Sequence, residues 1–236
     1  RGRGGSFSRV RVIAGAAGRT AFVGAVVVTA AAALLYTVMA TPARLRDRFD
    51  PELGPSLDGG AFLATAVHHD RIQIELAADG AAMAWLRENV VGNPVVLEAA
   101  IPPYRWGSRI SMFTGLPTVL GWDWHQKQQR AIRRSDPVGR RARDVERIYS
   151  SADAADAVAL LHKYGVELVY VGPVERAYYA EPGLEKFSRS PELFAPLYST
   201  PDVQIYLVVG ATAPGAPPPV RARAIARVAT SAARAG

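Results

Sequence analysis

The sequence predicts one transmembrane helix followed by a small α/β layer domain with a mostly parallel sheet. Residues 20–40 are a run of 21 residues without a charge, about the length that crosses the hydrocarbon layer of a bilayer. Further along, amphipathic helical stretches alternate with short apolar runs, as in domains whose helices cover a parallel sheet. The chain has 236 residues, which allows one ordinary domain with extensions.

The apolar run at 20–40 has two competing interpretations besides a membrane span. A signal peptide is disfavoured by the length of the run and by the long basic segment before it. A helix buried inside a soluble domain rarely stays apolar on every face for about six turns. We therefore expect this segment to lie in the lipid bilayer of the cell membrane.

Arginines on the two sides of the run predict its direction. Five precede it and three follow it: Arg1, Arg3, Arg9, Arg11 and Arg19, then Arg44, Arg46 and Arg48. Segments rich in Lys and Arg stay in the cytoplasm, whereas Asp and Glu count little. The N-terminus is then cytoplasmic and the large domain extracytoplasmic.

The positive net charge of the chain comes from its two ends. Residues 20–210 carry 19 basic and 21 acidic side chains, while 1–19 and 211–236 carry nine arginines and no acid. A nucleic-acid-binding domain concentrates its cations on a folded face, so we expect no nucleic-acid partner. The chain has no cysteine, which excludes disulfides and thiolate metal sites.

Composition divides the chain into five parts. We expect a basic cytoplasmic flank at 1–19, the membrane helix at 20–40 and a proline-containing connector at 41–56. The extracytoplasmic α/β domain follows at 57–210. Because Pro, Ala, Gly and Arg dominate 211–236, that tail is expected to be disordered.

Periodicity and turn residues place the elements of the domain. Asp79 is a plausible N-cap, and Gly165 lies where a helix C-cap belongs. The final strand is compatible with an antiparallel position at an edge. We expect helices at 79–90, 124–131, 144–149 and 154–164, strands at 95–99, 166–171 and 203–209, and short elements at 109–113 and 118–120.

A series of short motifs between Leu57 and Tyr206 resembles one family of membrane proteins. The most specific of them is Thr114-Gly115-Leu116-Pro117-Thr118-Val119-Leu120-Gly121-Trp122 followed by His125. The other pieces are Leu57-Asp58-Gly59, Trp85 to Val90, Pro94 to Ala99, Tyr104, Arg109-Ile110-Ser111, Asp144-Val145, Ile148-Tyr149, Lys163 to Val166, Tyr170-Val171-Gly172, Glu175-Arg176 and Gly183 to Phe187. In this order the motifs resemble the C-terminal part of the chlor-archaeal YYY membrane proteins.

This resemblance implies a place in a larger protein. Members look like polytopic membrane proteins with a glycosyltransferase-like (GT-C) membrane core, whose catalytic acid lies in an early loop, and a C-terminal soluble domain outside the cell. The chain is then the last transmembrane helix and that domain. The family pattern has an acid after the histidine and a tryptophan before Arg130, whereas this chain has Gln126 and Gln129.

The first candidate site lies around Asp123 and His125. A histidine beside a carboxylate is a possible general base, and aromatic faces such as that of Trp122 suit sugars. Alternatively, the tryptophans cover a sheet edge while Asp123 caps the helix that follows. No second His or Asp stands at the spacing that metal ligands have, so we expect no metal site. No sequence motif indicates a cofactor, so we expect none.

The second candidate set lies at the ends of the expected strands. Strand ends in α/β sheets open onto ligand crevices, so Glu98, Arg109, Glu175 and Arg176 could share one rim. Salt bridges that hold the loops are the equally weighted alternative. Arg130 opens a run of arginines that is either a solvated face or a contact with anionic lipid.

Two functions remain open. In one, this domain helps a GT-C-like membrane core bind a lipid-linked sugar or acceptor. Convergence of six side chains on one cleft would support this function: Glu98, Tyr104, Arg109, Trp122, His125 and Arg176. In the other, it is a non-enzymatic, membrane-tethered binding or assembly module. In neither is the chain expected to be catalytic alone.

Overall fold

The computed structural model describes residues 5–54, 56–130 and 135–210, and the side chains of 5–14, 16 and 52 are not described. The expected disordered tail, 211–236, lies outside these residues. The chain divides into two compact units after Leu57. Each unit is described below by itself.

The first unit is dominated by one long helix, α1 (Gly5–Arg48), followed by the short turn η1 (Pro51–Leu53). Its segment from Ala17 to Arg48 contains a strongly apolar stretch of 18 residues, none of which is buried. By length and composition it is the one helix among the described residues that could cross a membrane. The helix continues well past the apolar run and includes Pro42.

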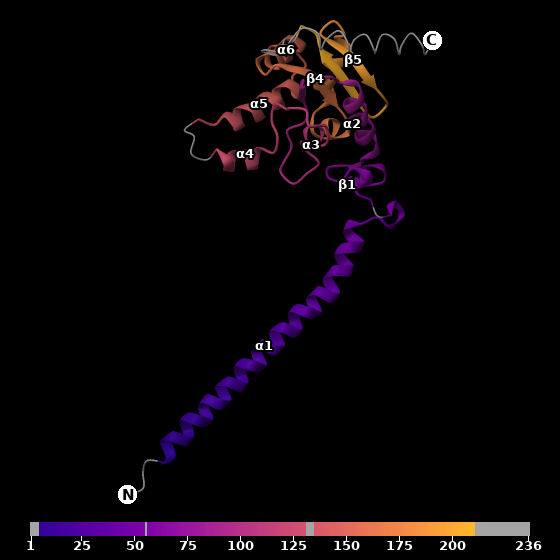
Figure 1. Ribbon diagram of the computed structural model, residues 1–236. Coiled ribbons are helices and arrows are strands. Elements are labelled where there is room, and N and C mark those ends of the chain that lie inside the picture. The colour runs from indigo at the N-terminus through magenta and orange to yellow at the C-terminus, as the bar shows by residue number, and fades with distance from the viewer. Residues whose placement is uncertain (1–4, 55, 131–134, 211–236) are drawn as a thin grey trace. The chain divides into compact units, whose positions relative to one another are not determined.

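The second unit is an α/β domain, which confirms the expected fold class (Figure 1). Its elements are η2 (Ala61–Ala64), β1 (Val67–His69), β2 (Gln73–Glu75), α2 (Ala77–Asn89), β3 (Val95–Leu97), α3 (Arg109–Thr114), α4 (Asp123–Gln129), α5 (Pro137–Ser150), α6 (Ala154–Lys163), β4 (Val166–Val171), α7 (Pro173–Tyr178), α8 (Glu181–Arg189), β5 (Phe194–Ser199) and β6 (Gln204–Val208).

The main sheet has the strand order β3-β4-β6-β5. Strands β3 and β4 are parallel, but β4 pairs with β6, and β6 with β5, in antiparallel fashion. The sheet is therefore mixed, and the expectation of a mostly parallel sheet holds only for its β3–β4 half. The physical reason is the close return of the chain between β5 and β6, since a short connection joins antiparallel neighbours whereas a parallel pair needs a crossover.

The last strand is antiparallel, as the sequence allowed, but it lies between β4 and β5 rather than at an edge. Strand β5 forms the edge instead, and Pro196 lies within it, where a missing N–H is tolerated. A separate antiparallel hairpin, β1–β2, completes the strands of the described residues.

Two helices begin after a capping aspartate, and one of them, α5, starts at Pro137 rather than at the expected 144. Asp153 caps α6 by accepting from the amide N–H of Ala155 at 2.8 Å. Asp136 caps α5 by accepting from Gly139 at 2.7 Å, with Pro137 at the first helical position. These caps satisfy amides that have no partner inside the helix.

Candidate functional site

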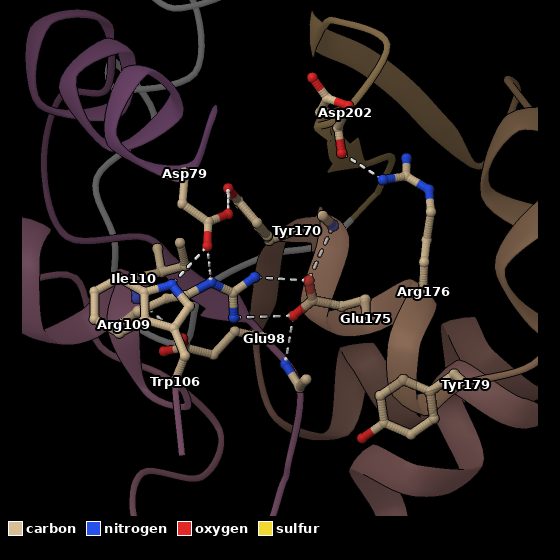
Figure 2. A network of polar contacts seen from close by, with 12 residues as sticks. Asp79, Glu98, Trp106, Arg109, Ile110, Tyr170, Glu175, Arg176, Tyr179 and Asp202 are labelled. Atoms are coloured by element: carbon tan, nitrogen blue, oxygen red, sulfur yellow. Dashed lines mark hydrogen bonds and ion pairs between the residues drawn. The ribbon is translucent and has the colours of Figure 1, made fainter. Parts of the chain in front are cut away.

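The centre of the α/β domain holds a buried arginine with two carboxylates (Figure 2). Arg109, the first residue of α3, is fully buried. Its Nε donates to Oδ2 of Asp79 at 2.6 Å, and one terminal nitrogen donates to Oε2 of Glu175 at 2.8 Å. The Tyr170 hydroxyl and the Trp106 indole N–H also donate to Asp79, at 2.6 and 2.8 Å. Asp79 therefore accepts three side-chain hydrogen bonds.

Glu175 joins the ends of two neighbouring strands. Besides binding Arg109, its carboxylate accepts from the backbone N–H groups of Gly172 and Ala99, each at 2.9 Å. Gly172 follows β4 and Ala99 lies just beyond β3. The carboxylate thus fixes the loops at the same end of the parallel strand pair.

Glu98 does not pair directly with Arg109. Its two oxygens accept from the backbone N–H groups of Ile110 and Ser111, at 3.0 and 3.1 Å, so the side chain caps the first turn of α3. Burial raises the pKa of Glu98, against the lowering effects of the Arg109 charge and the two amides. Glu98 therefore caps α3 and does not form the ion pair with Arg109 that was the alternative expectation.

Arg109 remains charged inside the domain. Burial by itself lowers the pKa of Arg109, but Asp79 and Glu175 raise it well above its ordinary value. The guanidinium also lies 5.0 Å from the ring centre of Tyr170. Asp79, Arg109 and Glu175 are each fully buried, so this network holds α2, α3 and α7 together and presents no surface to a ligand.

Arg176 lies apart from the buried network, although it is adjacent to Glu175 in sequence. Figure 2 shows its side chain directed to the loop of Asp202. There it donates to the Asp202 carbonyl and to Oε1 of Gln204. The structure therefore does not bring Arg176 and Glu98 to one rim.

The other candidates lie on the surface in an aromatic cluster of Tyr104, Trp122 and His125. The ring centres of Trp122 and His125 are 5.5 Å apart and those of Tyr104 and His125 are 6.2 Å apart, both edge to face. Tyr104 is 80% exposed and Trp122 is 39% exposed. The Trp122 indole N–H donates to the Gly107 carbonyl at 3.1 Å, which fixes the orientation of the ring.

Polar side chains of α4 are engaged with one another rather than with His125. Asp123 pairs with Lys127 at 2.8 Å, one turn along the helix. Arg130 donates to Oε1 of Gln126 at 2.9 Å. Asp123 is the first residue of α4 and makes no capping bond with its side chain. The described contacts therefore do not assemble an Asp–His pair for proton transfer.

The candidates thus fall into two groups and one separate residue, so those expected to converge do not meet in one cleft. Glu98, Arg109 and Glu175 are buried with each other, whereas Tyr104, Trp122, Asp123, His125 and Arg130 are at the surface, and Arg176 is exposed apart from both groups. A shallow surface depression is lined by His125, Gln126, Gln129 and Arg130. The surface group is therefore the set of candidates that can meet a ligand from solvent together.

Sequence reasoning missed the other members of the buried network, Asp79, Trp106 and Tyr170. Asp79 was expected to cap a helix, but it is the third residue of α2 and is buried. The sequence signal for the burial of Asp79 was its position among apolar residues on one face of the expected helix. Among the described residues, no group of three or more His, Asp or Glu is arranged to hold a metal.

Comparisons with known proteins do not extend this description. No family model, curated protein or solved structure matches the chain.

Proposed function

We propose that this chain is a membrane-anchored, extracytoplasmic binding domain that contacts the sugar of a lipid-linked ligand. Any transfer reaction would take place in a GT-C-like membrane core outside this chain, as the family resemblance implies. The observation that carries the proposal is the exposed cluster of Tyr104, Trp122 and His125.

The geometry of this cluster supports sugar contact. Aromatic rings at right angles form two walls of a corner, and the apolar faces of sugar rings pack well on aromatic faces. Trp122 is held by its hydrogen bond to Gly107, so it loses little freedom when a ligand binds. The neighbouring amide and guanidinium groups of Gln129 and Arg130 offer donors to sugar hydroxyls or to a linking phosphate.

The surroundings of the acids favour binding over catalysis. A glycosyl-transfer site uses a carboxylate that reaches the substrate. Glu98 and Glu175 are buried and saturated with donors, and Asp123 pairs with Lys127. Binding without chemistry is therefore the function best supported by this part of the chain.

Binding of a polyprenyl-phosphate hexose to the full chain in lipid nanodiscs tests the proposal. We expect saturable binding, and we expect Trp122→Ala and His125→Ala each to weaken it about tenfold, or roughly 1.4 kcal/mol. Met112→Ala, which removes an exposed non-aromatic side chain from α3, should leave affinity unchanged.

Circular dichroism of each variant serves as the folding control. The proposal fails if the wild-type chain binds none of a panel of hexose-bearing lipids. It also fails if Trp122→Ala, correctly folded, binds as tightly as the wild type. If the chain retains other membrane proteins and itself shows no affinity for sugar, the result would instead favour an assembly module.

A further inference from the structure

Charge in the α/β domain is segregated in one helical hairpin. From the start of α4 to Arg143, the described residues of 123–130 and 135–143 carry five basic side chains and two acidic ones, Asp123 and Asp136. The rest of 58–210, residues 131–134 aside, carries nine basic and 16 acidic side chains. This part of the hairpin is thus net positive on a domain that is otherwise negative.

Three of the hairpin's five basic side chains carry charges that no ion pair compensates. Arg130, Arg140 and Arg143 are exposed, and none forms an ion pair with another residue that the structure describes. Of the two acids, Asp136 uses its carboxylate to cap α5 and Asp123 pairs with Lys127. By contrast, Arg147 further along α5 pairs with Asp156 at 2.6 Å, and its charge is compensated.

An exposed tryptophan lies in the same hairpin. Trp124 is 50% exposed and stands one helical turn before Lys127 and Gln128 on α4, on the same helical face. Figure 1 shows α4 and α5 side by side at one end of the domain. Tryptophan next to Lys and Arg is the combination that proteins place at the level of lipid headgroups.

Chain length keeps this hairpin close to any membrane that contains α1. Nine residues separate the end of the helix at Arg48 from Asp58, and they span at most about 30 Å when fully extended. A bilayer that holds the apolar segment is therefore always within reach of the domain. A short tether of this kind raises the effective concentration of the membrane surface around the domain, which favours a second contact between the two.

We propose that the α4–α5 hairpin, through Trp124, Arg130, Arg140 and Arg143, docks on the anionic phospholipid surface of the bilayer that holds α1. This inference rests on the membrane anchoring of the proposed function but not on sugar binding. The charge of the lipid complements the charge of the hairpin, and each Lys or Arg near such a surface shifts the docked-to-undocked ratio roughly fivefold. The contact orients the domain on its tether.

The absence of cysteine in the chain allows one labelled site at a time. The full chain with Gln128→Cys carries a fluorophore on α4 and is reconstituted in liposomes that contain spin-labelled lipid as the quencher. One set contains phosphatidylcholine alone and the other also contains phosphatidylglycerol. A matched chain with Glu192→Cys reports from an exposed turn before β5.

Strong quenching at position 128 is expected only in the anionic liposomes, with little at position 192. Added salt should reduce it, because exposed charges are screened. Arg140→Glu with Arg143→Glu should lower the docked-to-undocked ratio by roughly 25-fold or more. Arg189→Glu, on α8 outside the hairpin, should leave quenching at position 128 unchanged.

Three results would overturn the docking surface. They are equal quenching in neutral and anionic liposomes, no quenching in either, and quenching that survives the double charge reversal. Binding of an oligonucleotide by the hairpin without charge-dependent quenching also contradicts the proposal. Flotation of the protein with the liposomes tests the anchor separately, and no sugar is present, so failure here is distinct from failure of the proposed function.

Discussion

At the scale of single residues, Arg109 is the side chain on which the domain most depends. A buried cation is costly unless its partners supply both charge and hydrogen bonds. Asp79 and Glu175 supply both, at 2.6 and 2.8 Å. Their own remaining acceptor sites are filled by Tyr170, Trp106 and backbone amides, which leaves few unsatisfied groups.

Arg109→Met should destabilise the domain strongly. The variant leaves Asp79 and Glu175 buried without a cation, and breaking a buried pair in this way costs about 3–5 kcal/mol. Chemical denaturation of the full chain in detergent measures the loss. Arg176→Met is the matched control, because that arginine is exposed, and it should cost less than about 1 kcal/mol. Equal losses in the two variants would contradict the structural role of Arg109.

Lys186 is the second buried cation, and it lacks a carboxylate partner among the described residues. Its side chain is only 3% exposed. The ammonium donates to the Gly183 carbonyl and lies 4.2 Å from the ring centre of Phe187. Burial lowers the pKa of Lys186 from 10.5 to about 8, against a small raising effect from Asp156.

This lowered pKa predicts that stability increases with pH. Between pH 8 and 10.5 the unfolded chain binds a proton that the folded chain has lost, so the free energy of unfolding rises by at most about 1.4 kcal/mol per pH unit. Denaturation at several pH values below 10 should show this rise in the wild type. Lys186→Met should remove it, whereas Lys163→Met, at an exposed ion pair, should keep it. Parallel pH profiles for the wild type and Lys186→Met would exclude this role.

At the scale of elements, the sequence predicted best where local signals agreed. Strand β4 was expected at 166–171 and is Val166–Val171. Helix α6 ends one residue earlier than expected, at Lys163, and Asp153 and Gly165 mark its two ends. Strand β3 ends at Leu97, two residues earlier than expected, and just beyond it the Ala99 N–H donates to the Glu175 carboxylate rather than to a neighbouring strand.

Sequence analysis missed several elements, among them α7, α8, β5 and the β1–β2 hairpin, and the strands among them depend on pairing with a neighbouring strand. Strand β5 contains Pro196 and is only intermittently buried, so alone it resembles a loop. It is a strand because β6 pairs with it. The β1–β2 hairpin is short enough, at three residues a strand, that no periodicity can develop. Pairing with the next strand along the chain overrides a weak pattern within the strand in both cases.

The packing of α8 on α5 predicts an intolerant glycine. A Cβ on Gly183 would lie 2.1 Å from the backbone oxygen of Tyr149 and 2.8 Å from that of Ser150. Because backbone cannot move aside cheaply, Gly183→Ala should lower the melting temperature through a loss of about 1–3 kcal/mol. Gly59→Ala, where an added Cβ meets nothing within 4 Å, should be neutral. An unchanged melting temperature for Gly183→Ala would show that the two helices are not in close contact.

At the scale of the whole molecule, composition was sufficient for the two-part organisation but not for the site. The apolar helix and the α/β class follow from patterns within short windows. The side-chain bonds of the buried network join positions that lie 27 to 91 residues apart, as Asp79 does with Trp106 and Tyr170. The spacing of apolar residues along the chain gives no information about such pairings. The sequence alone therefore could not distinguish charged side chains that are free to contact a ligand from those that hold the fold together.

Membrane insertion is the prediction that belongs to the whole chain. The full protein should remain with membranes after alkaline carbonate extraction. Ala31→Arg places a charge at the centre of the apolar run and costs insertion about 2.5–3.5 kcal/mol, so a large fraction should be extracted. Leu57→Arg, outside the run, should behave like the wild type. Recovery of the wild type in the soluble fraction would rule out the anchor.

The central place of β6 has a consequence for biogenesis. Strands β4 and β5 do not touch each other in the sheet; both pair with residues 204–208. Until those residues have left the ribosome, the earlier part of the domain has a split sheet with two unpaired margins. We therefore expect nascent chains of the domain to stay accessible to chaperones and proteases until residues 204–208 are available to pair with both strands.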